Sequence, residues 1–183
     1  MPSEAREIKL PLTADVIAQL RAGDSVQLSG AIYTARDAAH QRMISALEVG
    51  QGIPIELEEA VIYYCGPTPA PPGRPIGAAG PTTSARMDAF APQLYEAGVA
   101  ATIGKGQRAI EVRQACRTYG CLYLVATGGA GALLSSFITD AEVVAYADLG
   151  PEAIRKLTVV GFPVLVGYDM HGGSIFPGDQ DLD

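Results

Sequence analysis

The sequence predicts an α/β fold, because short apolar segments typical of strands alternate along the chain with segments that have helical periodicity. Its 183 residues are enough for one domain with a sizeable core. Hydrophobic residues make up 48% of the chain and charged residues 18%, a balance typical of a globular protein rather than a disordered one. Neither a linker nor an internal repeat is evident, so we expect a single domain over residues 1–183.

The expected strands are short runs rich in Val, Ile, Leu and Tyr. The run SVQLSG alternates in polarity as a strand does, whereas AVIYYC and CLYLVAT are almost wholly apolar. We expect strands or extended segments at residues 7–12, 25–30, 60–65, 99–104, 121–127, 143–148 and 159–169.

The expected helices lie between these strands. Thr13 is suited to cap a first helix, and Gly23 marks its end. Thr34 and Asp37 fit a broad form of the capping box, with Asp in place of Glu, so a second helix should begin there and run to about Val49. We expect helices at residues 13–23, 34–49, from about 84 onward, 107–118 and 151–157.

Two segments fall outside this alternation. Residues 66–86 are rich in proline and glycine but lack the Ser, Glu and Lys of a flexible linker. A long structured loop inside a compact domain is more often functional than not. The last residues, 172–183, read as a C-terminal tail or a docking segment.

Charge and hydropathy narrow the function class. The net charge of −7 and the pI of about 4.8 argue against a general nucleic-acid binder, which usually presents a basic face. No apolar run approaches the roughly 20 residues that span a bilayer, and the N-terminus lacks the apolar core of a signal peptide. We therefore expect a cytoplasmic protein without a membrane partner. In such an acidic chain, any local cluster of Arg and Lys indicates an anion site.

Three cations stand beside glycine or threonine where helices are expected to begin: Arg36 in TARDAAH, Arg86 in GPTTSARMD and Lys105 in IGKG. A helix N-terminus presents unpaired N–H groups and a partial positive charge, and an arginine there adds a bidentate fork for a carboxylate. Cations are unfavourable at this end of a helix unless an anion faces them. A single arginine of this kind is usually a solvated side chain, but three in an acidic protein point to a bound anion.

Neighbouring residues have less specific interpretations. Thr82 or Thr83 is suited to cap the helix that contains Arg86. His40 lies one turn after Arg36. It could serve as an acid/base group or a ligand, but a histidine at such a position is more often a structural residue behind the site. Asp37 is expected to cap the helix and orient Arg36 rather than act as a catalytic acid, and we assign His171 no role.

Two cofactor patterns fail on their spacing. The stretch GVAATIGKGQ resembles a P-loop, but five residues separate Gly98 from Gly104 and the residue after Lys105 is glycine, not Ser or Thr. The three cysteines, Cys65, Cys116 and Cys121, lack the C-x2-C pair usual for an iron–sulfur cluster and read as buried thiols. We therefore expect no metal or cofactor bound by this chain's own residues.

These motifs together resemble the C-terminal region of class I, iron–sulfur fumarases, which in many organisms is a separate β subunit. L(+)-tartrate dehydratase has a related β subunit. The resemblance covers about residues 7–173, and its most specific part is the ordered set RDxAH, GPTTxxRMD and GKG. It implies a swivelling β/β/α domain and the reversible hydration of fumarate to L-malate. It also implies a 4Fe–4S cluster that is carried by a partner α subunit, in an αβ or (αβ)2 assembly.

The resemblance also implies roles for particular residues. Arg36, Arg86 and Lys105, with Thr83, would bind the carboxylates of a small dicarboxylate substrate. Thr82 would be the base at the substrate carbon, with Lys105 beside it. A threonine hydroxyl is far from ionised near neutral pH, so this role requires a cation and a dry pocket that lower its pKa.

Three other functions fit the same residues. The cation set would also hold tartrate, as in a tartrate dehydratase β subunit that forms oxaloacetate. A non-catalytic module that senses a dicarboxylate needs the same cations but no partner. A purely structural subunit is the weakest alternative, because packing alone does not need clustered cations.

Overall fold

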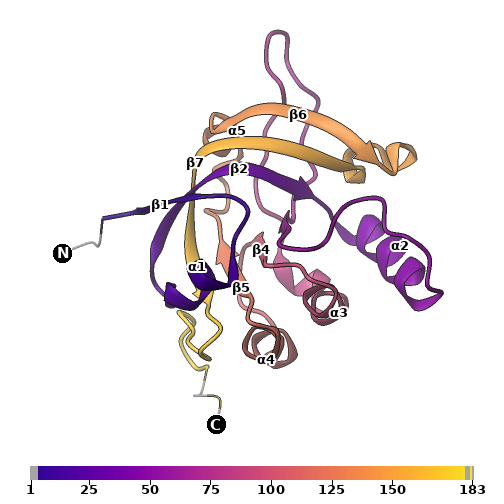
Figure 1. Cartoon of the computed structure of the whole chain (residues 1–183). Helices are drawn as coiled ribbons and strands as arrows, with labels where there is room; N and C mark the ends of the chain where they lie inside the picture. Colours follow the sequence, from indigo (N-terminus) through magenta and orange to yellow (C-terminus); the bar gives the residue numbers. More distant parts are fainter. Residues whose placement is uncertain (1–3, 180–181, 183) are drawn as a thin grey trace.

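Within residues 4–179 and 182, which the computed structural model describes, seven strands form one sheet, so the predicted α/β class is confirmed (Figure 1). The strands are β1 (Arg6–Lys9), β2 (Ser25–Thr34), β3 (Val61–Tyr63), β4 (Ala101–Gly104), β5 (Leu122–Val125), β6 (Ile138–Ala145) and β7 (Ile154–Tyr168). Their order is β1-β2-β3-β4-β5-β7-β6, and β7 also pairs with β2. The five strands β2, β3, β4, β5 and β7 therefore close into a barrel-like ring.

Strand direction divides this ring in two. Strands β1 to β5 are mutually parallel, so their carboxyl ends meet at one edge. Strand β7 runs antiparallel to all its neighbours: β2 pairs along one side of it, while β6 and β5 share the other.

Five α-helices and two 3-10 helices accompany the described strands. They are α1 (Ala14–Gln19), α2 (Asp37–Glu48), η1 (Ser84–Met87), α3 (Ala91–Glu96), α4 (Ile110–Tyr119), α5 (Gly131–Ser135) and η2 (Ala147–Glu152). Helices α2, α3 and α4 lie on one side of the strands (Figure 1). No helix of this part of the chain is long and apolar enough to cross a membrane.

Two cores result from the alternation of side chains. Along the segment that contains β3, Val61, Tyr63 and Cys65 join the core among the strands, while Ile62 and Tyr64 face the core beneath α2, α3 and α4. Both faces of this segment are buried, which explains its continuous apolar sequence.

The expected helix at residues 151–157 is wrong. Pro151 and Glu152 end the 3-10 helix η2, and β7 begins at Ile154. Arg155, Lys156 and Leu157 pair with β2 on one side and β6 on the other, so pairing on both sides outweighs the local helical propensity of this segment. The strand expected at 143–148 likewise ends at Ala145 and begins earlier, at Ile138.

The capping predictions had mixed outcomes. Thr13 caps α1 as expected, accepting a hydrogen bond from Val16 N, although the helix ends at Gln19. The Thr34–Asp37 capping box is wrong, because Thr34 ends β2 and its hydroxyl accepts from Arg155 N. Glu152, which is distant in the sequence, caps the start of α2 instead, since its carboxylate accepts a hydrogen bond from Ala38 N at 3.3 Å.

The segment after β7, expected as a tail at residues 172–183, packs back on the domain as far as Asp179. The buried Asp169 carboxylate accepts hydrogen bonds from three N–H groups at 2.8–2.9 Å, those of Ala22, His171 and Gly173. The Phe176 ring stacks on Tyr123 with centroids 6.3 Å apart. Residues 180, 181 and 183 lie outside the described part.

Candidate active site

Two of the site residues predicted from the sequence, Arg36 and Lys105, follow the carboxyl ends of parallel strands, and two glycines follow the neighbouring parallel strands. Arg36 follows β2, Gly66 follows β3, Lys105 follows β4 and Gly128 follows β5. In α/β sheets this edge is where ligands bind, because the loops that leave it converge.

One carboxylate, Asp37, lies between two of the predicted cations. Arg86 makes two contacts with it, Nε to Oδ1 and Nη2 to Oδ2, both at 3.0 Å. Arg36 Nε is 3.8 Å from Asp37 Oδ2, is shielded from solvent and has no hydrogen-bond partner among the described residues. Asp37 thus lies beside Arg36 but makes its shorter contacts with Arg86, and its orienting role stays a prediction. Asp37 is not a cap, however, because Arg36 occupies the N-cap position of α2.

Arg36 lies against Gly66. A Cβ at position 66 would stand 2.9 Å from Arg36 Nη1 and 3.0 Å from its Cδ. Glycine therefore makes room for this guanidinium.

The two threonines and the lysine form a second group. Thr82 N donates to Tyr64 O at 2.7 Å, Thr83 forms a parallel β-bridge with Lys105, and Ser84 N donates to Lys105 O at 3.0 Å. Residues 82–84 thus enter between the ends of β3 and β4. The Lys105 side chain passes over Gly128, where a Cβ would be 3.8 Å from the Nζ atom. Within the described part of the chain, that ammonium makes no hydrogen bond or ion pair.

Of the three predicted cations, only Arg36 lies at the N-terminus of an α-helix. Arg86 belongs to the four-residue 3-10 helix η1, where neither threonine makes a capping bond, and Lys105 lies five residues before α4. The positive potential at this edge therefore comes from side chains more than from helix dipoles.

His40 lies behind Arg36. Its Nδ1 is 2.8 Å from Arg36 O, and its ring packs edge-on against Tyr64 with centroids 5.3 Å apart. A carbonyl only accepts, so Nδ1 carries the proton. Burial lowers the pKa of His40 from 6.5 to about 4, which keeps the ring neutral. This position fits the structural interpretation of His40 better than the catalytic one.

The cysteines do not fit an iron–sulfur centre. All three are free and buried, and burial raises the pKa of each thiol to about 12, which keeps it protonated. Cys121 donates to Val99 O at 3.2 Å. Among the residues that the structure describes, no three His, Cys, Asp or Glu side chains are grouped to hold a metal.

Sequence reasoning missed the buried residues that support the site. Arg108, whose side chain is fully buried, donates to Asp88 Oδ1 at 2.5 Å and to Tyr64 OH at 3.2 Å. Tyr123 OH lies 2.8 Å from Ser84 Oγ and 2.7 Å from Gly106 O. In the sequence, Asp88 and Arg108 appear only as charged residues after the threonine segment and the lysine turn, and their partners are distant along the chain.

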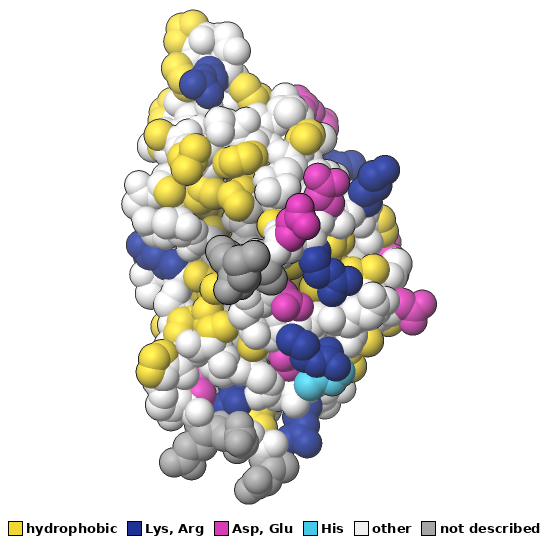
Figure 2. Space-filling model, turned by 90° about the vertical axis from the view of Figure 1, so that its left-hand side faces the viewer, with side chains coloured by type: hydrophobic (Ala, Val, Ile, Leu, Met, Phe, Trp, Pro, Cys, Tyr) yellow, Lys and Arg dark blue, Asp and Glu magenta, His cyan; other side chains and the backbone are white. Residues whose placement is uncertain are grey.

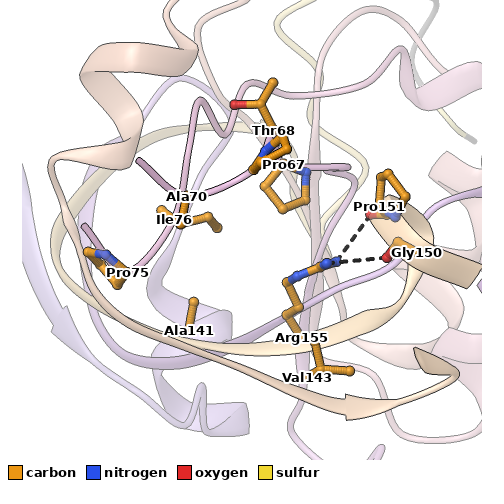
Figure 3. A pocket seen from close by; sticks show the side chains of 11 residues that line it. Pro67, Thr68, Ala70, Pro75, Ile76, Ala141, Val143, Gly150, Pro151 and Arg155 are labelled. Atoms are coloured by element: carbon orange, nitrogen blue, oxygen red, sulfur yellow. Dashed lines mark hydrogen bonds between the residues drawn. The ribbon is translucent and has the colours of Figure 1, made fainter. Parts of the chain in front are cut away.

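An open groove adjoins the site. It has a volume of about 380 Å³ and runs between the proline-rich loop and the segment from β6 to η2 (Figure 3). Its walls are mainly apolar, and its one charged side chain, Arg155, is turned to the carbonyls of Gly150 and Pro151. The loop rises above the rest of the molecule, with hydrophobic side chains gathered below its tip (Figure 2). The groove meets the site at Pro151, whose carbonyl lies 3.5 Å from the Cβ position of Gly66.

The fold and this edge define an α/β domain that gathers two arginines, a lysine and two threonines where its parallel strands end. The comparisons with known proteins give the family. The chain belongs to the family described as "Fumarase C-terminus", whose model matches residues 2–178. The predicted resemblance is therefore confirmed.

Individual relatives fall into two groups. The chain is 39% identical over 154 residues to "Fumarate hydratase 1, mitochondrial" of Leishmania major and 36% identical over 167 residues to "Fumarate hydratase class I, aerobic" of Escherichia coli K12. These alignments cover 82% and 88% of this chain but only 28% and 30% of those proteins. It is also 38% identical over 171 residues to the "Putative L(+)-tartrate dehydratase subunit beta" of Methanocaldococcus jannaschii, covering 90% of this chain and 88% of that protein.

Proposed function

We propose that this chain is the β subunit of a hydro-lyase that reversibly hydrates fumarate to L-malate, active together with an iron–sulfur α subunit. The supporting observation is the charge balance at the sheet edge. Arg36, Arg86 and Lys105 carry three positive charges and Asp37 one negative charge, which leaves two, equal and opposite to a dicarboxylate dianion. The nearby Glu152 carboxylate is engaged with the N-terminus of α2.

Each residue has a chemical part in this proposal. The guanidinium groups of Arg36 and Arg86 bind one carboxylate of the substrate, and Lys105 with Thr83 binds the other. Removing the proton next to a carboxylate builds an enolate-like dianion, which cations already aimed at that carboxylate stabilise. Thr82, beside Lys105 in the bridged segment, is the proposed base.

The partner is proposed on the relatives' lengths. The chain spans about a third or less of the fumarate hydratases that it matches, and most of a protein named as a β subunit. On the name of that β subunit, the partner would be a separate α subunit in an αβ or (αβ)2 assembly. A 4Fe–4S cluster would belong to that subunit, since the buried thiols of this chain do not fit one. We expect the assembly to be cytoplasmic.

The apolar groove is where we propose that the α subunit docks. Its lining is mainly apolar, and its one charged side chain, Arg155, is hydrogen-bonded to backbone carbonyls, so it suits an aliphatic segment. It also runs into the site beside Arg36, so a chain seated there would help to enclose the substrate.

Tartrate dehydration is the second candidate, because a relative that the chain covers to 88% of its length is named as a putative L(+)-tartrate dehydratase β subunit. The same cations would hold tartrate.

The test is co-production of this chain with its iron–sulfur partner under anaerobic conditions, followed by assays with fumarate, mesaconate and tartrate. Each subunit alone serves as a control. Fumarate turnover only in the mixture supports the proposal, and tartrate turnover instead changes the substrate. A cluster-loaded complex without turnover, combined with malate binding to this chain alone, would favour the sensor alternative.

Substitutions assign the residues. Arg36→Ala and Arg86→Ala should each lower kcat/KM by several orders of magnitude without disturbing assembly. Arg42→Ala is the matched control, because Arg42 lies on the same helix but pairs with the exposed Asp148. Thr82→Ser should keep more activity than Thr82→Ala if a hydroxyl is the base.

A further inference from the structure

One tyrosine hydroxyl touches both segments that carry the second half of the proposed site. Tyr123 OH, from β5, lies 2.8 Å from Ser84 Oγ in the threonine segment and 2.7 Å from Gly106 O in the lysine turn. The side chain is fully buried, and burial raises the pKa of Tyr123, so the hydroxyl keeps its proton. It therefore joins two loops that are about 20 residues apart in the sequence.

An ion pair joins the same two segments further along. Asp88, just after η1, accepts from Arg108 Nε at 2.5 Å and from Ala109 N at 2.7 Å. The Arg108 guanidinium also donates to Thr102 Oγ1 at 3.3 Å and lies 4.9 Å from the centre of the Tyr123 ring.

The backbone alone gives these segments little mutual support. Thr83 and Lys105 form an isolated bridge rather than part of a strand ladder. Ser84 fits closely over β4, since its Oγ is 1.9 Å from where a Cβ on Gly104 would stand. The register of the bridge thus depends on side-chain contacts that flank it.

We propose that Tyr123 is a positioning residue, whose hydroxyl sets the placement of Thr82 and Thr83 relative to Lys105. The Asp88–Arg108 pair fixes the far end of the same two segments. Tyr123 does not reach the sheet edge itself, and it acts on the substrate only through the groups that it holds. This inference rests on the proposed function for the meaning of those groups.

The test compares Tyr123→Phe with Tyr63→Phe. Both tyrosines are fully buried in strands, and Tyr63 OH donates to Ala79 O at 2.6 Å, so each variant loses one buried hydroxyl that contacts a backbone carbonyl. The first readout is hydrogen exchange at the Ser84 amide, which reports its bond to Lys105 O. The second is kcat and KM of the complete αβ complex.

Tyr123→Phe should speed exchange at Ser84 about five- to tenfold, the worth of one hydrogen bond. It should also lower kcat about 10- to 100-fold, because small misplacements of catalytic groups are costly. Tyr63→Phe should lower the Tm comparably and change neither readout. Ser84→Ala, which leaves the Tyr123 contact with Gly106, should fall between them.

Unchanged Ser84 exchange in Tyr123→Phe, or equal acceleration in both tyrosine variants, would overturn the inference. An inactive wild-type complex would instead refute the proposed function, and the exchange comparison would still decide whether Tyr123 holds the bridge.

Discussion

Replacing Asp88 with asparagine should destabilise the domain strongly, because it leaves the buried charge of Arg108 without its counter-ion. The Arg108 side chain is 0% exposed and that of Asp88 15%, with Nε and Oδ1 2.5 Å apart. An arginine does not lose its proton inside a protein, so the positive charge stays. Removing one partner of a buried ion pair costs about 3–5 kcal/mol. For a domain of this size, that corresponds to a fall in Tm of about 6–20 °C.

Thermal unfolding followed by circular dichroism measures the effect, with Asp148→Asn as the matched control. Asp148 also binds an arginine through two contacts, at 2.9 and 2.7 Å to Arg42, but its side chain is 64% exposed. Water and salt screen such a pair, so its loss should shift the Tm far less. Similar shifts in the two variants would show that the Asp88–Arg108 pair is not the buried anchor that its geometry indicates.

Three further predictions address the site, the histidine and the groove. Gly66→Ala should leave the Tm unchanged but raise the KM of the complex about 10- to 100-fold, because its Cβ would stand 2.9 Å from Arg36 Nη1 and displace the guanidinium; an unchanged KM would contradict this. His40 has a pKa of about 4 in the fold against 6.5 when unfolded, so the unfolded state binds the proton first and roughly 3 kcal/mol of stability is lost as the pH falls through this window. Urea unfolding of His40→Asn, which retains a donor for Arg36 O, should show a weaker loss between these pH values, and an equal loss would rule out His40 as its cause. Val143→Asp in the groove should abolish co-purification of the α subunit while Val49→Asp, at a position 68% exposed, should not; retention by both would place the interface elsewhere.

Local patterns in the sequence were sufficient for most strands and for the helices that pack on them. The strand segments at 60–65 and 121–127 were visible because both faces are buried and the sequence is continuously apolar. Residues 151–157 were misread because their composition suits a helix, while their environment between β2 and β6 requires a strand. The pairing with β2 comes from residues more than 100 positions away, which no local pattern reports.

The candidate site shows the same difference between local patterns, which the sequence reveals, and contacts between distant residues, which it does not. Arg36, Arg86 and Lys105 stand out in the sequence because charged residues are rare beside its glycine- and threonine-rich turns. The pairing of Arg86 with Asp37 does not, since the two residues are 49 positions apart in the sequence.

The contacts around Arg36, Arg86 and Lys105 explain how three cations can stay close together at one sheet edge. Like charges gathered at one sheet edge repel each other, and flexible side chains would relieve that repulsion by turning into solvent. Asp37 prevents this for Arg86 through a bidentate contact, and Gly66 admits the Arg36 guanidinium close to the backbone. Lys105 has no such side-chain partner among the described residues, so its placement depends on the backbone on either side of it. That backbone is held by the bridge to Thr83, by Tyr123 at Gly106 and by Asp88 at Arg108 and Ala109. The free-energy cost of bringing these cations together is therefore met during folding. A small dianion that binds at this edge does not have to supply it, and such preorganisation favours strong binding.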